Sequence, residues 1–526
     1  ILWLLFGSFL CCLLPWVLIG SGLLIVKWLQ AFLQFPMTVV NVALFPTMMI
    51  IGMGVSVHIL TEFFRSRRGN LDCRDSAKTT IRNLFKPVWF TALTTAAGFG
   101  ALSVTNLVPV KQYAILAASG SLIMFIVAMT TFISFLSFVK SVPTKKKYLF
   151  SEGWVVSLTK KVPTFAKSNQ NRIVLFAFAM VGFCCFAVPK ISVDSNIFNY
   201  FKSGSWIYQD MKYFDKLYKF SGIELVLDSG RSEAIKEPSF LRQVEGLQFY
   251  LNSLDSTGRV LSLVDRLKQT RKALYNDDEQ FYRLPDSSEM TAQLLMIYLN
   301  SGPEHDLSDQ IDFDNRFLRI GVPIENLSAA KFSNFYYDLR SNLNKLFPDL
   351  DIMFTGPLIL YNAQEIYINS GLKRSFGLAL LMIGLSFLIL FKSVKYGIIA
   401  LFPSVLPILT VGGLTAFIGI SLDLGTIIVG AMAMGIAVDD AIHVMARYIT
   451  YKEAGQSTRA SVKRAVQESG KPVIFTSLIL VFGFSAMLFA SLIPTIFFGI
   501  FVALIMALAV IGDLIILPAL LFLTDK

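Results

Sequence analysis

Residues 86–99 read KPVWFTALTTAAGF and residues 471–484 read KPVIFTSLILVFGF, so eight of the 14 positions are identical without a gap. The same offset of 385 residues aligns His58 with His443. Both copies lie in long apolar segments, which indicates an internally duplicated membrane protein. Long internal repeats of this kind are typical of transporter folds.

The two copies differ in one informative pair of residues. Asp439 and Asp440 stand in the second copy where the first copy has Gly54 and Val55. One charged Asp at the centre of a membrane helix costs about 2.5–3.5 kcal/mol on insertion scales, so an intramembrane acid indicates function. Two adjacent acids are tolerated only where they face protein or water, or carry protons. Because successive helical residues differ by about 100°, one Asp can face the opposite half while the other faces a neighbouring helix.

Further polar residues occur in the duplicated helices. His443 lies one turn from Asp439 on the same helix face, and His58 takes the matching position in the first copy. The two histidines fit either the cytoplasmic mouth of a polar pathway or a structural hydrogen bond to a carbonyl near the helix end. Threonine in a membrane helix often satisfies its own hydroxyl, although two threonines occupy matched positions of the repeat. Three hydroxyl side chains complete the candidate proton relay: Ser56, Thr91 and Thr476.

Four glycines of the duplicated helices have a simpler interpretation. Small residues let membrane helices approach closely. We expect close helix contacts at Gly98, Gly483, Gly430 and Gly435.

The composition supports a polytopic α-helical protein. Hydrophobic residues make up 54% of the chain and the mean hydropathy is +0.60, too apolar for an ordinary soluble domain. The chain starts without Met inside an apolar stretch, residues 1–7, and shows no signal-peptide pattern, so we expect a fragment of a longer protein. Ten complete membrane spans are predicted, at residues 10–33, 39–64, 87–107, 112–139, 172–189, 374–392, 396–420, 424–448, 472–492 and 496–523.

The charges predict the topology. The net charge is +11, yet the polar stretch 190–372 has 19 Lys and Arg against 25 Asp and Glu, so the remainder carries +17. Much of this excess lies in loops 65–86, 140–171 and 449–471, which the positive-inside rule places in the cytoplasm. Residues 190–372 then lie outside and the C-terminus inside. The basic excess is therefore a topology signal, and no nucleic-acid partner is expected.

The polar stretch 190–372 predicts an extracytoplasmic α+β domain. Two strand–helix–strand patterns, at 222–265 and 317–360, favour two ferredoxin-like sandwiches with helices on one face. None of the five cysteines lies in this stretch, so it folds without disulfides. The acidic run between the two patterns is more typical of a solvated surface than of a calcium site; it comprises Glu304, Asp306, Asp309, Asp312 and Asp314.

The sequence shows no motif of a soluble enzyme or of a nucleotide-driven pump. It contains no GxSxG, HExxH or Walker A pattern, and no Cys/His spacing typical of a metal site. We therefore expect no enzymatic activity, no cofactor and no bound metal. A pump of this kind does not use ATP unless a partner supplies it.

At residues 435–448, GIAVDDAIHVMARY, followed by the basic amphipathic stretch 457–469 and by 471–484, the chain resembles the resistance–nodulation–division (RND) superfamily. It is most similar to the branch of large membrane-protein (MMPL) exporters, whose architecture the sterol-sensing relatives share. The resemblance implies twelve helices in two parallel halves, each with an extracytoplasmic porter domain after its first helix. This chain then lacks the first helix, the first porter domain and most of the second helix.

The resemblance also implies proton-driven transport, with acids in the fourth and tenth helices as the relay. Asp439 and Asp440 match the tenth-helix position, whereas Gly54 and Val55 depart from the fourth-helix pattern. The function expected is export of hydrophobic or lipidic molecules driven by the proton-motive force. A non-transporting sterol or lipid sensor, and a proton-driven helper of protein or lipid export, stay open as alternatives.

The expected partners are the lipid bilayer, a hydrophobic or lipid substrate and protons, with a homo-oligomer left open. The expected location is the plasma membrane, in bacteria the inner membrane. Five segments are expected: the partial first-half bundle 1–139, a cytoplasmic basic linker 140–171, the first helix of the second half 172–189, the porter domain 190–372, and the second-half bundle 373–526.

Overall fold

The computed structural model describes residues 9–38, 40–68, 71–138, 153–219, 221–301, 307–423 and 425–525. The apolar stretch 1–7, most of the basic run in the predicted linker, and Glu304 and Asp306 lie outside the described residues. The chain divides into two compact units. The first, which we call the helical unit, comprises residues up to Val193 and from Tyr367 onward. The second, Asp194–Ile366, lies within the predicted extracytoplasmic domain and is called the outer unit.

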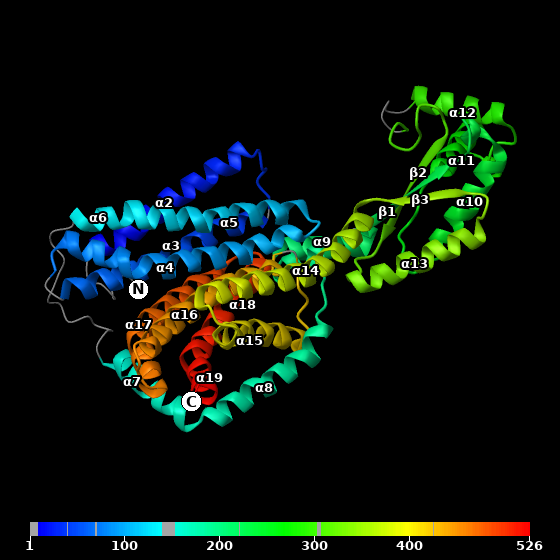
Figure 1. Ribbon diagram of the computed structural model, residues 1–526. Coiled ribbons are helices and arrows are strands. Elements are labelled where there is room, and N and C mark those ends of the chain that lie inside the picture. Colours follow the sequence, from blue (N-terminus) through cyan, green and yellow to red (C-terminus); the bar gives the residue numbers. More distant parts are fainter. Residues whose placement is uncertain are drawn as a thin grey trace. The chain divides into compact units, whose positions relative to one another are not determined.

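The first half of the helical unit is a set of long apolar helices (blue to cyan in Figure 1). Its last helix passes through a π-helical turn, η3 (Ala128–Phe132), into a short continuation. The other elements are α2 (Phe9–Phe32), η1 (Val40–Ala43), α3 (Leu44–Arg68), α4 (Cys73–Gly100), η2 (Ala101–Val104), α5 (Val108–Val127), α6 (Ile133–Phe138) and the linker helix α7 (Trp154–Ser168).

The second half repeats this pattern, and its last helix also contains a π-helical turn, η9 (Gly512–Ile516). One helix, α14 (Pro357–Phe391), belongs to both units. The other elements are α8 (Gln170–Ala187), η4 (Val188–Lys190), α15 (Val394–Ile418), α16 (Ile428–Glu453), α17 (Thr458–Ser485), η8 (Ala486–Phe489), α18 (Ile493–Ile511) and α19 (Leu517–Thr524).

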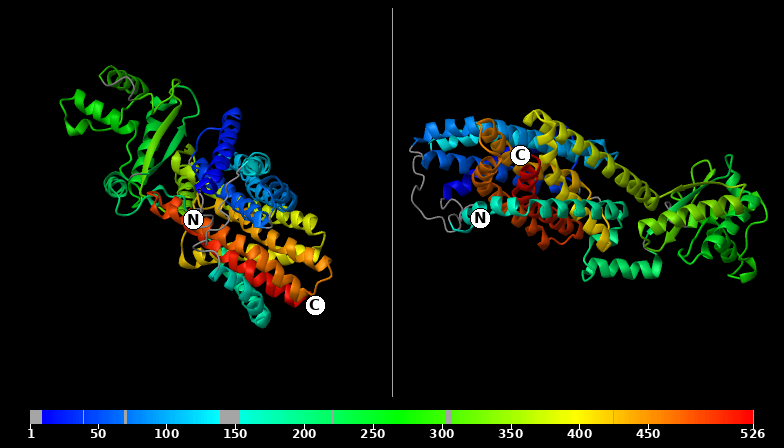
Figure 2. Two further views of the ribbon diagram at one scale, coloured as in Figure 1. Left: turned by 90° about the vertical axis from the view of Figure 1, so that its left-hand side faces the viewer. Right: turned by 60° about the horizontal axis from the view of Figure 1, so that its bottom comes forward.

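The duplication read from the sequence is present in the structure. Helices α4 and α17 begin and end at positions that differ by the same 385 residues. Their N-caps, Asp72 and Ser457, are matched too, and each side chain accepts a hydrogen bond from a backbone N–H of the first turn. Helix α16 packs on α4, and α17 packs on α3. These two reciprocal contacts relate the halves by an approximate two-fold axis, so that first-half and second-half helices lie side by side in both views of Figure 2.

Within the described part, ten helical segments are long and apolar enough to cross a membrane, which confirms the predicted number of spans. Several of these helices are longer than their apolar runs. Helix α14 starts at Pro357, well before the predicted start of its span at residue 374, and α4 starts at Cys73 rather than residue 87. Hydropathy marks only the apolar part of a helix, whereas backbone hydrogen bonding continues into the polar sequence beyond it.

The expected glycine contacts are found at one helix crossing. A Cβ at Gly98 of α4 would lie 2.8 Å from Gly435 Cα of α16, so the two backbones touch. Gly483 has no atom within 4 Å of such a Cβ, and Gly430 has only an ordinary contact at 3.9 Å. The α17–α3 crossing differs because Ile50 stands in α3 where α16 has Gly435.

The outer unit contains one antiparallel three-stranded sheet with the order β2–β1–β3. Burial alternates along β1 and β2, so the helices cover one face. The central strand pairs with β2 from Ser221↔Ile324 to Asp228↔Phe317. The strands are β1 (Ser221–Asp228), β2 (Phe317–Ile324) and β3 (Asp351–Thr355); the helices are η5 (Ile197–Tyr200), α9 (Trp206–Tyr218), η6 (Ala234–Lys236), α10 (Pro238–Asn252), α11 (Leu263–Leu274), η7 (Glu279–Phe281), α12 (Ser288–Ser301) and α13 (Ala329–Leu346).

The prediction of two sandwiches is wrong, because both strand–helix patterns contribute to this single sheet. The strand expected at 259–265 is absent, and its place is taken by the start of α11 and by an isolated bridge, Thr257↔Ile324. The strand order and pairing are those of a ferredoxin-like sheet whose second strand is reduced to that bridge. The strand expected at 351–360 ends at Thr355, because α14 begins at Pro357.

Candidate functional site

Helix α16 carries the two adjacent acids and is the most covered of the ten spans. In its apolar window, 89% of the residues are buried, against 22–61% in the other nine. Its neighbours include α4, α15, α17 and α18, so protein surrounds it on several sides. The side chains of Asp439 and Asp440 therefore meet protein rather than lipid. Such burial in protein avoids the free-energy cost of placing charged carboxylates in the hydrocarbon of a membrane.

Asp439 faces the first half of the duplication. Its Oδ1 atom accepts a hydrogen bond of 2.7 Å from the Thr91 hydroxyl of α4. The same oxygen lies 3.3 Å from Nε2 of His443, one turn further along α16, as an ion pair when the histidine is protonated. Asp439 thus connects the two halves through one short hydrogen bond and pairs with one basic group.

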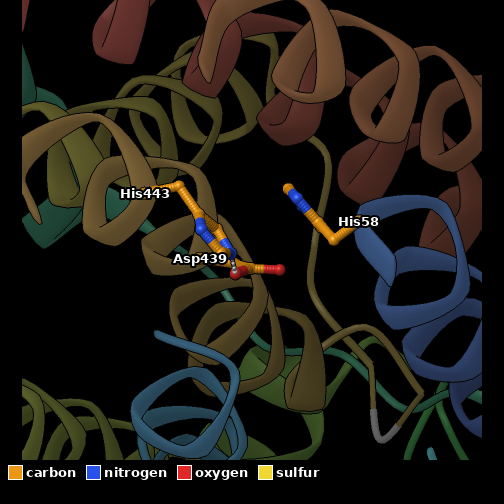
Figure 3. A group of neighbouring side chains, drawn as sticks. All are labelled: His58, Asp439 and His443. Atoms are coloured by element: carbon orange, nitrogen blue, oxygen red, sulfur yellow. Dashed lines mark ion pairs between the residues drawn. The ribbon is translucent and has the colours of Figure 1, made fainter. Parts of the chain in front are cut away.

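The two matched histidines meet at the approximate two-fold axis. The rings of His58 on α3 and His443 on α16 stack with centroids 4.2 Å apart and planes 16° apart. Figure 3 shows His58 reaching from the first half toward the pair formed by His443 and Asp439. Equivalent residues of the two copies are therefore in direct contact at the interface between the halves.

Asp440 faces its own half. Its two carboxylate oxygens accept hydrogen bonds from neighbouring residues of α17: Ser477 donates at 2.9 Å and Thr476 at 3.3 Å. Asp440, Thr476 and Ser477 are all buried. Adjacent acids on one helix therefore have different surroundings, one across the interface between the halves and one inside the second half.

His58, Asp439 and His443 lie close enough to raise the question of a metal site. Their potential ligand atoms are all within 4.8 Å of one another. A metal ion bound by two imidazoles lies close to both ring planes, because each nitrogen lone pair lies in its own ring. The nearly parallel, stacked rings do not allow this near the site. The stacked geometry is therefore unfavourable for a metal ion held by both imidazoles.

A polar cavity of about 520 Å³ leads from His443 to the side of the helical unit that carries the basic loops. It is lined by residues of α3, α4, α16 and α17. Four of them form an ion-pair cluster of Glu62, Arg65, Arg447 and Glu468. The cavity thus connects His443 with a polar, charged lining.

The ion-pair cluster also joins the halves. Arg447 of α16 lies 2.6 Å from Glu468 of α17 and 3.6 Å from Glu62 of α3. Arg65 of α3 lies 3.4 Å from Glu468. Glu62 and Arg447 occupy matched positions of the repeat, so a second pair of equivalent residues meets one turn from the histidines.

The structure thus brings together six of the seven predicted relay residues and leaves one apart. The hydroxyl of Ser56 donates 2.7 Å to the backbone carbonyl of Gly52 in its own helix, and no contact to either acid was found among the described residues. Two residues near the acids were not predicted. Ser477 is adjacent to a predicted threonine, and Asp513 is an acid inside a predicted span. A hydroxyl residue next to a predicted relay threonine, and an acid inside a predicted membrane span, were the sequence features that could have identified them.

Comparison with known proteins supports the membrane assignment. A model of the MMPL family matches residues 1–165 and 314–525. A protein of Methanocaldococcus jannaschii, MJ1562, which is described as a membrane protein, is 22% identical over 305 residues. That alignment covers 56% of this chain and 73% of the relative.

Proposed function

The chain belongs to the MMPL family, a family of membrane transporters, and on this basis we propose that it exports hydrophobic or lipidic molecules by using the proton-motive force. The observation that carries the proposal is the position of Asp439. Its carboxylate accepts a hydrogen bond from Thr91 of the first half and pairs with His443 of the second. A group at this interface can couple its protonation to the relative position of the halves.

Protonation of Asp439 changes the contacts between the halves. As an anion, Asp439 attracts both the Thr91 hydroxyl and a protonated His443. Hydrogen bonds to a charged group contribute about 1.5–3 kcal/mol, and a proton on the carboxylate removes that charge. The two halves are then held less tightly at α4 and α16. Differential contacts of this size are sufficient to shift a two-state equilibrium about 10-fold or more.

The polar cavity supports a proton route on one side of the site. A proton on Asp439 can pass to His443, and from there to the polar cavity beside Glu62 and Glu468. Histidine is suited to this step because its ordinary pKa lies near neutrality. With the basic loops in the cytoplasm, protons leave the site toward the cytoplasm, which is the direction that drives export.

A second cavity in the helical unit supports a hydrophobic substrate. It has a volume of about 170 Å³ and is lined almost entirely by apolar side chains of η4, α14, α15, α16 and α18 and of the loop that precedes α16. Phe376 and Phe501 contribute aromatic surface, and Lys373 adds one basic group. A lipid acyl chain with an anionic headgroup matches this lining.

Proton-driven flux in proteoliposomes that contain the full-length protein tests the proposal. We expect Asp439→Asn to abolish efflux of a fluorescent lipid driven by a pH gradient, while the protein stays folded because the amide is nearly isosteric. Thr91→Val removes the only hydroxyl donor to Asp439 found among the described residues and should slow efflux about 10-fold. Thr476→Val should have a smaller effect, because Ser477 still donates to Asp440.

Asp423→Asn is the matched control, since Asp423 is a buried acid whose hydrogen bonds are to Thr426 in the loop before α16. Its variant should retain driven efflux. Unchanged efflux in Asp439→Asn combined with Asp440→Asn would contradict proton coupling at this site. Lipid binding without wild-type flux would instead support the sensor alternative.

A further inference from the structure

A third acid, Asp513, lies beside the two acids of α16. Its side chain is completely buried, and neither carboxyl oxygen has a hydrogen-bond partner among the described residues. The charged groups that act on it electrostatically are Asp440 and, more weakly, Asp439. A buried carboxylate with neither a donor nor a positive partner costs several kcal/mol. The surroundings of Asp513 therefore accommodate the neutral acid.

Asp513 is held in the interior by the π-helical turn η9. Such turns interrupt α-helices rarely and are frequent at functional sites. The preceding residue, Gly512, lies so close to α15 that a Cβ there would be 2.7 Å from the carbonyl oxygen of Pro403. The turn also contacts α16. The local backbone geometry thus places the acid between α15 and the helix that carries the relay.

The duplication shows that the turn and the acid are separate features. The first half has its own π-helical turn at Ala128–Phe132, and Ala128 occupies the position that matches Asp513. The turn therefore forms without an acid. The first half likewise has Gly54 and Val55 in place of the α16 acids. All three acids belong to the second half, where they lie together.

We propose that Asp513 is a third proton-binding acid of the relay, which exchanges its proton with Asp440. In this step, for which the two carboxyl groups must first come within hydrogen-bond distance, the O–H bond of the Asp513 carboxylic acid breaks and an O–H bond forms on the Asp440 carboxylate, so the total charge of the cluster is unchanged. Only an ionised carboxylate can accept the proton. The hydroxyls of Ser477 and Thr476 donate hydrogen bonds to Asp440 and so stabilise its ionised form. The inference rests on the proposed proton-coupled function.

The basic residues on the other helices packed against η9 do not offer a competing partner. They are exposed on the surface of the helical unit, whereas Asp513 is buried. They are Lys160, Lys161 and Lys167 of α7, Arg172 of α8 and Lys395 of α15. Asp439 and Asp440 are thus the titratable groups of α16 that face Asp513.

Infrared difference spectroscopy of the purified full-length protein tests the inference, because neutral carboxylic acids have a carbonyl band separate from that of carboxylates. Asp513→Asn should remove one neutral-acid band at neutral pH. Asp228→Asn in the outer unit should remove none, because the Arg316 guanidinium holds the pKa of Asp228 at about 2. Asp440→Asn should change the pH at which the Asp513 band disappears.

An unchanged neutral-acid spectrum in Asp513→Asn would overturn the inference, as would a pH profile that Asp440→Asn leaves unaltered. The second measurement uses the native Asp513 and does not require the Asp513 variant to fold. In the flux assay, Asp513→Asn should lower proton-driven efflux on the order of 10²-fold. If Asp513→Asn kept full efflux, Asp513 would not be part of the relay, but the proposed function would stand. If the spectra were as expected but the wild-type protein showed no proton-driven efflux, the proposed function would be rejected and the protonated state of Asp513 would stand.

Discussion

Adjacent acids of α16 differ in what holds them. Asp440 accepts hydrogen bonds from α17, which belongs to the same half as α16. Asp439 accepts its hydrogen bond from Thr91 of α4, in the other half. The 100° step of the helix thus gives one acid a partner in the other half and its neighbour partners within its own half. If the halves are displaced as we propose, we expect the contacts of Asp439 to change before those of Asp440.

An ion pair in the outer unit predicts a pH dependence. Arg316 donates two hydrogen bonds to Asp228, at 2.8 and 2.7 Å, and these lower the pKa of Asp228 from its ordinary value of 3.8 to about 2. Because the folded-state pKa is lowered, Asp228 stabilises the outer unit above pH 4 and loses this effect as the pH falls toward 2. Hydrogen exchange of β1 and β2, corrected for intrinsic rates, should show loss of protection in that range.

Asp228→Asn should abolish this pH-dependent part of the protection. Asp338→Asn on the exposed face of α13 removes the same charge at a distance from the pair and serves as the control. Equal acid sensitivity in the wild type and in Asp228→Asn would contradict the assignment.

The sequence predicted the residues of the site that depend on helix geometry and on the repeat. His443 follows Asp439 by one turn, and the repeat alone pairs His58 with His443. It failed for Ser56, because a serine on a membrane helix bonds its own backbone equally well. Asp513 was not predicted because it lies 73 residues after Asp440 in the sequence and matches Ala128, not an acid, in the first half. Only the packing of η9 against α16 brings it close to the acids.

At the scale of elements, the crossing of α4 and α16 depends on glycine. In Gly98→Ala the new methyl group would meet backbone atoms of Ala431 and Gly435 at 2.8–3.0 Å, and backbone cannot move aside as a side chain can. We expect a loss of about 1–3 kcal/mol in the free energy of unfolding. The measurement is thermal unfolding of the purified protein in detergent.

The repeat provides the control for this substitution. Gly483 matches Gly98 but has open space, so Gly483→Ala should be neutral or stabilising by up to about 1 kcal/mol. Equal effects of the two substitutions would show that the tight crossing is not a determinant of stability.

In the outer unit, two predicted strands overlap the starts of helices. Residues 259–265 (RVLSLVD) are a short, mostly apolar run that is also compatible with a buried strand, but Ser262 and Asp265 form a capping box that starts α11. Gly356, with φ of +105°, ends β3, and Pro357 follows as the first residue of α14. The capping pattern and the Gly–Pro pair were visible in the sequence and indicate helix starts more directly than a short apolar run indicates a strand.

At the scale of the whole molecule, the repeat explains why equivalent residues meet. An approximate two-fold axis between the halves brings His58 to His443 and Glu62 to Arg447. The second pair has opposite charges at matched positions, and the three aspartates of the site, Asp439, Asp440 and Asp513, occur in the second half only. The duplication thus supplies a symmetric frame, and a few substitutions give the two halves different chemistry.

Orientation in the membrane decides which side the polar cavity serves. The cavity beside His443 is lined by Arg65, Ser66 and Leu71 near one basic loop and by Tyr451 and Glu468 near another. The positive-inside rule places both loops in the cytoplasm. Residues of the outer unit should then be reached from outside the cell, and the histidine pair should exchange protons with the cytoplasm.

Cysteine labelling tests this orientation in a variant that lacks the five native cysteines. Ser253→Cys lies on an exposed position of the outer unit, and Ala454→Cys lies in the exposed turn between α16 and α17. A membrane-impermeant maleimide should label Ser253→Cys in intact cells and Ala454→Cys only after permeabilisation. The reverse pattern would place the cavity on the outer side. Protons would then enter through the cavity from outside the cell. The pair of Asp439 and His443 would take up protons from the outside instead of releasing them to the cytoplasm.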